Sequence, residues 1–243
     1  MTTEDKIEKF RNVFESEIEE IALFLKQNKN PTNLFILKFN NSIYELLDST
    51  FTLLHKKYIE SSGSIISTLW ERNLTIEYIF LDFENRTEIY NTHNKLKKSP
   101  WKIFKMVQEV CELNNHPKLN NNIKFNLYYI QYSFLCAIKH GNPYTFKYLN
   151  REEIQSEMGL NTFDEKSDSD LIIYLKIITL NIIFEYLTNF YHFINDEKKV
   201  NFINQVDFIF SELIKQLEIN VPRIINPSKD EYDEEVWNYF DNL

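Results

Sequence analysis

The chain has 243 residues and a net charge of −9, and hydrophobic and aromatic residues make up 43% and 15% of it. A chain of this length and hydrophobicity can bury a core without disulfides or metals, and extensive disorder is not expected. Only three glycines are present, whereas phosphate-binding loops and tight hairpins use glycine freely because they need positive φ or close backbone approach. The totals therefore argue against a P-loop, a doubly wound α/β fold and most β architectures.

Apolar residues recur at intervals of three and four along the chain, which predicts amphipathic helices. The first helix has an apolar face formed by Ile7, Phe10, Phe14, Ile18, Ile21 and Leu25, and it ends at Asn30-Pro31. A break at 61–63 is predicted, and Ser99-Pro100 predicts an N-cap followed by proline at the first helical position. The later helices are predicted over residues 31–59, 64–83, 84–98, 101–113, 123–140, 168–194 and 196–219.

These elements predict an all-α fold, a single up-down bundle of long amphipathic helices over residues 1–220, with peripheral short helices and an acidic segment at 221–243. The most apolar stretch, 171–187, is interrupted by Lys176, Asn181 and Glu185. A membrane span needs about 20 mostly apolar residues, so we interpret this stretch as a central bundle helix. The charged N-terminus does not resemble a signal peptide, and we expect a cytoplasmic protein with no membrane partner.

The charge is distributed unevenly along the chain. Residues 86–151 contain eleven basic residues and three acidic ones, a net charge of +8, which leaves −17 for the rest. One interpretation is a positive surface for an anionic partner such as RNA, with tyrosines that stack on unpaired bases. The alternative is that the lysines pair with acidic helices elsewhere in the bundle. The candidate RNA-binding residues are Asn142, Tyr132, Lys147, Lys97 and Lys98.

His140 is the histidine with the most informative context. It is predicted in the last turn of a helix, next to Lys139 and just before Gly141-Asn142-Pro143. An imidazole there can act as an acid or base near neutral pH, and Lys139 would help to hold a phosphate. The alternative is structural, because a histidine at a helix C-terminus also hydrogen-bonds the last carbonyls and complements the helix dipole.

Glu71 and Arg72 interrupt an otherwise apolar and aromatic helix. A carboxylate near the bundle interior needs a partner, because leaving it unpaired is costly. Glu71 is therefore predicted either to form an ion pair with a lysine or Arg72, or to orient His140 and raise its pKa. No cofactor and no metal are expected, since no motif with a convincing metal-ligand spacing is present, and the cysteines form no CxxC pair.

The residues at 67–71 (STLWE), continuing to 78–80 and 84–86, resemble a pattern found in a group of helical prokaryotic proteins. The later stretch from Tyr132 to 139–143 (KHGNP) resembles a second element of that group, which is similar to HEPN-type helical bundles. The resemblance covers residues 30–195. It implies a metal-independent ribonuclease of a toxin, defence or abortive-infection system, working as a homodimer or with a protein partner such as an antitoxin.

On this hypothesis His140 is the acid/base, Glu71 is its orienting carboxylate, and Lys139 and Arg72 are the cations that stabilise negative charge in place of the family's arginines. Two departures from the family pattern bear on this assignment. The arginine of the first element aligns with Ser67, and the arginine that precedes the histidine would fall within 133–135, where Ser, Phe and Leu stand. The alternative function is a non-catalytic helical module that binds a protein or nucleic acid, and nothing in the sequence favours a small-molecule binder.

Overall fold

The computed structural model describes residues 2–95, 100–113, 135, 139 and 165–216. Within these residues the chain forms helices and no strand, so the predicted all-α class is confirmed. The helices are α1 (Thr3–Gln27), α2 (Pro31–His55), α3 (Ile59–Phe80), α4 (Phe83–Lys95), α5 (Ile103–Leu113), α9 (Glu165–Phe193) and α10 (Glu197–Gln216).

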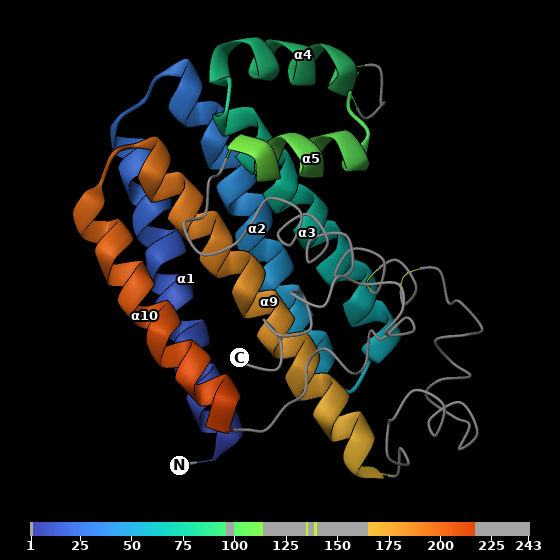
Figure 1. Cartoon of the computed structure of the whole chain (residues 1–243). Helices are drawn as coiled ribbons and strands as arrows, with labels where there is room; N and C mark the ends of the chain where they lie inside the picture. The colour runs from blue at the N-terminus through green and yellow to red at the C-terminus, as the bar shows by residue number, and fades with distance from the viewer. Residues whose placement is uncertain (1, 96–99, 114–134, 136–138, 140–164, 217–243) are drawn as a thin grey trace.

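Helix α9 lies in the middle of the bundle (Figure 1). It packs against α1, α2, α3 and α10, and α2 also packs against α1 and α3. Short connections join α1 to α2, α2 to α3 and α9 to α10, which makes these neighbours antiparallel. The shorter helices α4 and α5 contact α3 and lie at one end of it, as Figure 1 shows. Long helices in an up-down arrangement with short peripheral helices agree with the sequence prediction.

The hydrophobic core follows the predicted periodicity. The apolar face of α1 is buried from Ile7 to Leu25, with Phe10 partly buried against Phe210 of α10 at a ring distance of 4.9 Å. Helix α9 buries side chains on nearly every side, and Tyr174, Tyr186 and Phe190 are among the largest fully buried residues. Each buried large apolar side chain contributes roughly 1.5–3 kcal/mol relative to an exposed one.

The starts of α1 and α2 are fixed by side-chain caps. The Thr2 hydroxyl accepts from the Asp5 backbone N–H at 3.1 Å, and the Asp5 carboxylate accepts from the Thr2 N–H at 2.7 Å. This capping box satisfies two backbone donors reciprocally, and the hydrogen bonds from Thr2 lower the pKa of Asp5. At α2, Asn30 accepts from the Asn33 N–H at 2.7 Å and Pro31 occupies the first turn, so the helix starts at the residue that the sequence predicted.

The break between α2 and α3 does not lie at 61–63, so that prediction was wrong. Helix α2 ends at His55, and Lys57 takes a positive φ of 60° in the connection. Residues 61–63 belong to the first turns of α3. Ser62 is compatible with the helix because its hydroxyl donates to the Tyr58 carbonyl at 2.7 Å, which satisfies the side chain locally.

The predicted start of α5 was also wrong. Pro100 and Trp101 precede the helix, which begins at Ile103. The Lys102 carbonyl accepts from the Met106 N–H at 3.1 Å, so Lys102 stands at the N-cap position. The starts of α9 and α10 agree with the sequence to within a few residues, and the connection between them carries Asn195 at a φ of 57°. The predicted helix at 123–140 and the boundary at residue 220 lie outside the described residues.

One stretch of the described chain, Leu171–Phe193 of α9, is long and apolar enough to cross a membrane by length and composition alone. In the bundle, 72% of this stretch is buried by the rest of the protein. Burial of this kind is typical of the core helix of a soluble protein, in agreement with the predicted central position of 171–187.

Two buried polar groups join α9 to the hairpin of α1 and α2. Asn40 of α2 accepts from the Tyr186 hydroxyl at 2.8 Å and donates to the Ile18 carbonyl of α1 at 3.1 Å. Glu17 of α1, only 6% exposed, accepts from the Tyr191 hydroxyl at 2.6 Å and from Lys199 of α10 at 2.9 Å. Each contact satisfies a group whose burial without a partner would cost roughly 1–3 kcal/mol.

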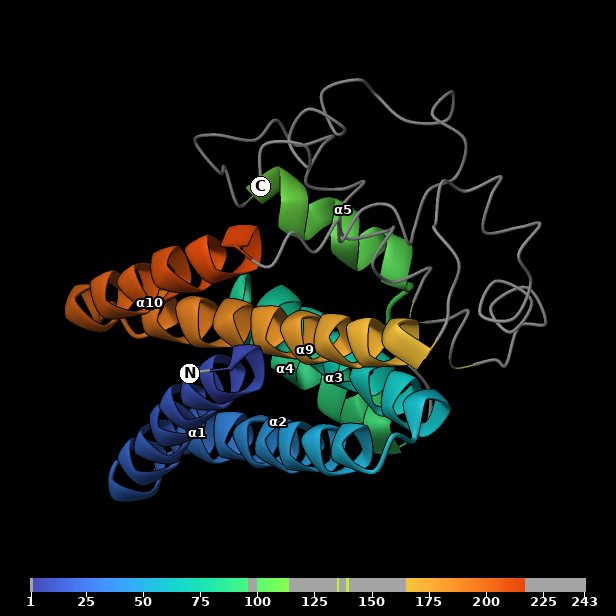
Figure 2. The same cartoon turned by 90° about the horizontal axis from the view of Figure 1, so that it is seen from below.

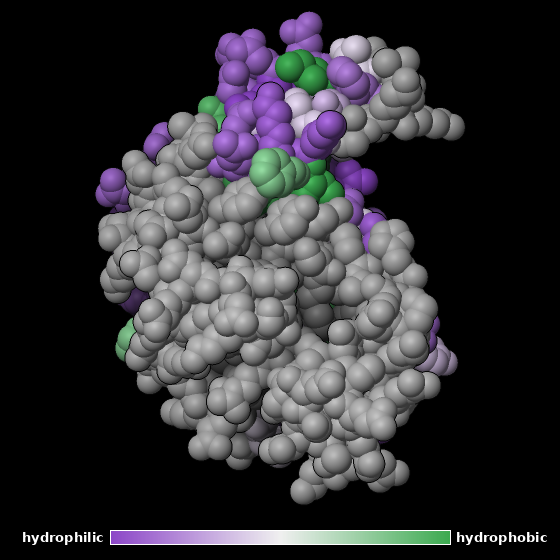
Figure 3. Space-filling model, turned by 45° about the vertical axis from the view of Figure 1, so that its right-hand side comes forward, coloured by the Kyte–Doolittle hydropathy of each residue, from purple (hydrophilic) through white to green (hydrophobic). Residues whose placement is uncertain are grey.

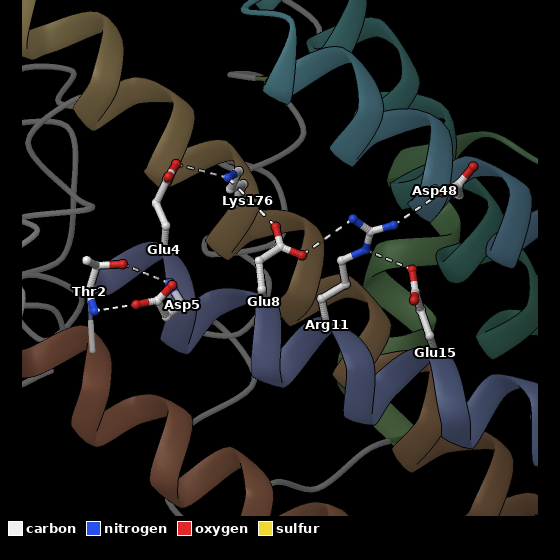
Figure 4. Close-up of polar contacts among 8 residues, drawn as sticks. All are labelled: Thr2, Glu4, Asp5, Glu8, Arg11, Glu15, Asp48 and Lys176. Atoms are coloured by element: carbon white, nitrogen blue, oxygen red, sulfur yellow. Dashed lines mark hydrogen bonds and ion pairs between the residues drawn. The ribbon is translucent and has the colours of Figure 1, made fainter.

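A second ionic cluster surrounds Lys176 and Arg11 (Figure 4). Lys176 of α9 reaches the Glu4 carboxylate at 3.2 Å and that of Glu8 at 4.0 Å. Arg11 forms ion pairs with carboxylates of α1 and α2. Its guanidinium carbon lies 4.8 Å from the centre of the Phe51 ring. The partners of Arg11 are Glu8 at 3.5 Å, Glu15 at 2.8 Å and Asp48 of α2 at 3.2 Å. The lysine that interrupts the apolar stretch at 171–187 is therefore paired with carboxylates of α1.

Asp207 of α10 gives a prediction about pH. Burial raises the pKa of this carboxyl from 3.8 to about 6, so the folded protein binds one more proton than the unfolded chain between these values. The stabilisation is present below pH 4 and is lost as the pH rises through 6. We expect Asp207→Asn to raise the free energy of unfolding by about 1–2 kcal/mol at pH 7 and by little at pH 4. Urea unfolding at both pH values measures this, and an equal gain at pH 4 would contradict it.

Candidate functional site

The candidate site is centred on Glu71 in the middle of α3. This helix packs against α2, α9, α4 and α5, because its apolar residues lie around most of its circumference. Leu69, Trp70 and Leu74 on either side of Glu71 are buried. Glu71 lies where the α3 surface is partly open to solvent, and its side chain is 36% exposed.

Glu71 contacts Lys139, a residue 68 positions later in the chain. The Lys139 Nζ donates to Glu71 Oε1 at 3.2 Å, and the lysine side chain is 32% exposed. The contact is the ion pair with a lysine that the sequence left as one alternative for Glu71. It brings together two of the four residues predicted to act in catalysis, at a position that a ligand in solution can reach.

Arg72 points away from this ion pair. Its Nη1 donates to the Tyr90 hydroxyl of α4 at 2.9 Å, and its guanidinium carbon lies 5.9 Å from the centre of the Phe39 ring of α2. Consecutive residues on a helix differ in direction by about 100°, and the Arg72 guanidinium lies toward α2 and α4 and not toward Lys139. The geometry gives Arg72 a part in joining α3 to α2 and α4.

The predicted basic surface divides into paired and unpaired residues. Arg86 pairs with Glu109 at 2.8 Å, donates to the Tyr78 carbonyl at 2.6 Å and stacks over the Tyr78 ring at 3.7 Å. Lys105 pairs with the same Glu109 at 3.5 Å. Lys102 is exposed and has no acidic partner among the residues whose side chains are described. Arg86 and Lys105 therefore follow the alternative interpretation, in which basic residues pair with acids of the bundle.

The end of the molecule formed by α4 is hydrophilic, as Figure 3 shows for the part of this face that is described. Its exposed charged side chains from 82 to 93 are Asp82, Glu84 and Glu88, all of which are acidic. Arg86, the only lysine or arginine from 82 to 93, is turned toward α5 and Glu109. Among the α4 side chains that are described, which end at 93, no lysine or arginine is exposed to add positive charge to an RNA-binding surface.

The remaining predicted site residues lie outside the described residues. They are His140, Asn142, Tyr132, Lys147, Lys97 and Lys98. Their proposed roles stay predictions. Ser67, where the family pattern has an arginine, is fully buried in α3, so this position does not present a side chain to solvent in the described bundle.

Buried polar groups on the α9 side of α3 were not singled out from the sequence. Asn73 is buried and donates from Nδ2 to Glu185 Oε2 of α9 at 3.3 Å, while its Oδ1 and the Ser67 hydroxyl have no hydrogen-bond partner among the described residues. Glu77, one turn later, is also buried. The sequence could have indicated these buried polar groups, because 70, 73 and 77 share one face of the helix. Within the described residues, no group of three or more His, Cys, Asp and Glu side chains could hold a metal.

Comparison with known proteins gives no relative: no family model matches the chain, and no match was found among curated proteins or solved structures. The resemblance to HEPN-type bundles therefore stays a prediction that depends on the residues quoted for it.

Proposed function

We propose that the protein is a HEPN-like, metal-independent ribonuclease that acts in the cytoplasm in a prokaryotic defence or toxin system. The observation that carries the proposal is the contact between Glu71 and Lys139 at 3.2 Å, at a position where both side chains are about one third exposed. His140, the proposed acid/base, is the next residue in the chain after Lys139.

The proposed chemistry uses side chains alone. The His140 imidazole takes the proton of a ribose 2′-hydroxyl, whose oxygen then attacks the adjacent phosphorus. The bond from phosphorus to the 5′-oxygen of the next nucleotide breaks, and that oxygen takes the proton back from the His140 imidazolium, which leaves a 2′,3′-cyclic phosphate and a 5′-hydroxyl. A lysine ammonium stabilises the negative charge that develops on the phosphoryl oxygens. The surplus of basic residues in 86–151, eleven against three acidic ones, supports an anionic substrate.

The test is cleavage of cellular RNA by the full chain in EDTA. We expect cyclic-phosphate products from the wild type and a loss of rate of about 10²–10⁴-fold in His140→Ala, as removal of a general acid/base produces. His55→Ala is the matched control, because His55 is an exposed histidine at the end of α2. Equal activity of His140→Ala and the wild type would dispose of the assignment.

Glu71→Gln separates two roles of the carboxylate. If Glu71 orients His140, the substitution lowers the cleavage rate without weakening RNA binding. If Glu71 only neutralises Lys139, the substitution frees the ammonium, so RNA binding becomes tighter and the cleavage rate stays the same. Filter binding and single-turnover cleavage of one RNA distinguish the two roles. Both are measured on the same preparation, with Lys139→Ala alongside.

A second candidate function is a non-catalytic helical module that binds a protein or a nucleic acid. The engagement of Arg72 with Tyr90 and Phe39 favours it, because this arginine is one of the two cations proposed for catalysis. Recovery of one stoichiometric partner in a pull-down with the full chain, together with no RNA turnover, would favour this function over the first.

A further inference from the structure

The turn between α1 and α2 lies at the end of the bundle opposite the N-terminus (Figure 1), and we call residues 23–38 the hairpin tip. No acidic residue lies between Glu20 and Glu45, although the chain as a whole has a net charge of −9. Three lysines of the tip are exposed and form no ion pair with any described residue: Lys26, Lys29 and Lys38. The tip is therefore a locally basic surface on an acidic protein.

Exposed apolar side chains lie beside these lysines. Leu23, Phe24 and Leu34 are 56%, 41% and 46% exposed, and they make up three of the nine large hydrophobic side chains that are exposed among the described residues. Leu23 is three residues before Lys26, and Leu34 is four before Lys38, so each leucine shares a helix face with a lysine. The opposite faces of both helices are buried in the core, which leaves this outer face for a partner.

Hydrogen bonds fix the shape of the turn. The backbone N–H and the Nδ2 of Asn28 both donate to the Phe24 carbonyl, at 3.1 and 3.0 Å. Asn30 caps the start of α2, and the Asn33 Nδ2 donates to the Asn28 carbonyl at 2.5 Å. The exposed apolar side chains are thus carried by complete helical turns, so a partner that buries them has little backbone to order.

Lysines mixed with aliphatic side chains fit a lipid surface better than they fit other partners. Protein interfaces are depleted of lysine, and their centres are depleted of charge. Single-stranded nucleic acid is bound by aromatic rings that stack on the bases, whereas two of the three exposed apolar side chains of the tip are leucines. At an anionic membrane, apolar side chains enter the headgroup region, and lysine ammonium groups reach the lipid phosphates on flexible aliphatic stems.

We propose that the hairpin tip binds to the surface of an anionic membrane, with Leu23, Phe24 and Leu34 in the headgroup region and the three lysines against lipid phosphates. Glu20, the nearest acid along α1, is already paired with Lys199 at 2.6 Å. Acids more than about 10 Å from the membrane are screened by salt. The sequence prediction of no membrane partner considered only a spanning helix and a signal peptide, and a peripheral contact needs neither.

This surface is separate from the candidate site. The tip belongs to α1 and α2, which form a layer on the side of α9 opposite to α5 (Figure 2). Glu71 lies in the middle of α3 and contacts Lys139. The proposal therefore does not depend on ribonuclease activity.

The first experiment is co-sedimentation of the full chain with vesicles of phosphatidylcholine, alone or mixed with phosphatidylglycerol. We expect binding to the mixed vesicles that weakens as the salt concentration rises. Each lysine near an anionic surface contributes about fivefold in affinity, or about 1 kcal/mol. The triple variant Lys26→Ala, Lys29→Ala and Lys38→Ala should therefore bind about 100-fold more weakly. No binding to the mixed vesicles, or equal binding to both kinds, would overturn the proposal.

The matched control removes three exposed lysines from other parts of the chain: Lys9→Ala, Lys56→Ala and Lys102→Ala. It changes the net charge by the same amount, and its affinity for the vesicles should stay close to that of the wild type. Circular dichroism verifies that both triple variants fold. An equal loss of affinity in the two would show that binding follows net charge and not the tip, and the proposal would then fail.

The apolar contribution is tested separately from the charge. Leu23→Ser combined with Phe24→Ser should weaken vesicle binding by about 10-fold or more, because two large apolar side chains leave the membrane. Phe208→Ser combined with Ile209→Ser is the control, since these side chains of α10 are 67% and 59% exposed. Unchanged binding of the Leu23 and Phe24 variant, or an equal loss in the α10 variant, would contradict insertion of the tip.

Fluorescence and RNA binding decide between a membrane and a nucleic acid. Phe24→Trp should give an emission that shifts to the blue with mixed vesicles and is quenched by brominated acyl chains, after subtraction of the wild-type spectrum with its three tryptophans. Phe208→Trp should give neither change. If the triple lysine variant loses its affinity for RNA but keeps its affinity for vesicles, the tip is a nucleic-acid surface and the proposal is wrong.

Discussion

Lys176→Glu is expected to destabilise the protein by about 4 kcal/mol or more, whereas Lys176→Met should change the free energy of unfolding by less than about 1 kcal/mol. The lysine side chain is only 6% exposed, and it lies against Glu4 and Glu8. A glutamate here would place a further carboxylate in a buried position beside two others. Methionine keeps the length and most of the apolar volume of the side chain.

We expect Lys176→Met to change the stability little, because the partner carboxylates stay hydrated without the lysine. Glu4 and Glu8 are 65% and 43% exposed, so water solvates them when the ammonium is removed. Chemical unfolding of the two variants at pH 7 measures both values. A large loss in Lys176→Met would mean that the ion pairs themselves, and not the burial of the aliphatic stem, hold α9 against α1.

Substitutions in the cluster of Glu17, Tyr191 and Lys199 should cause the second large loss of stability. Tyr191→Phe removes the hydroxyl that donates to Glu17 at 2.6 Å, and we expect a loss of about 2 kcal/mol. Lys199→Ala should cost a similar amount, because it leaves a buried carboxylate without its cation. Lys199 is itself partly exposed, which screens the pair and limits the loss. Equilibrium unfolding in urea measures both variants.

Glu17→Gln in the Tyr191→Phe and Lys199→Ala backgrounds is the control for this explanation. If the loss arises from the uncompensated charge of Glu17, removing that charge recovers part of the stability. No recovery in the double variants would show that the losses come from packing.

The same cluster predicts lower stability at alkaline pH. Burial lowers the pKa of Lys199, but hydrogen bonds to Glu20 and Glu17 outweigh it, so the pKa is raised above 10.5. Burial and the bond to Glu17 also raise the pKa of Tyr191. For both groups the folded state holds its proton more tightly, so their stabilisation is complete below pH 10 and declines as the pH rises through the folded values.

Much of the fold could be predicted because hydrophobic periodicity is a local property. The apolar face of α1 and the start of α2 at a proline can both be recognised from residues that are close together in the sequence. The two errors in helix boundaries arose where local signals compete with packing. Residues 61–63 are weak helix formers that the bundle nevertheless holds in α3, and Pro100 stands before the N-cap and not after it.

The candidate site could be predicted only in part, because its contacts join residues far apart in the chain. The sequence showed that Glu71 needs a partner but could not choose between Arg72, an unspecified lysine and His140. The choice depends on which side of α3 each helix occupies. Glu17 was missed although it lies on the apolar face, three residues after Phe14 and four before Ile21, because only its neighbours on α9 and α10 explain it.

The hydroxyls of Tyr186 and Tyr191 have a consequence for how α9 is positioned along its own axis. A helix that is apolar on nearly every side could slide by one turn, about 5.4 Å, and still meet hydrocarbon. In any such shifted alignment Asn40 and Glu17 would lose their donors from α9. These two contacts therefore select one alignment among several that hydrophobic packing alone would allow. A single polar residue fixes the register of coiled-coil helices in the same way.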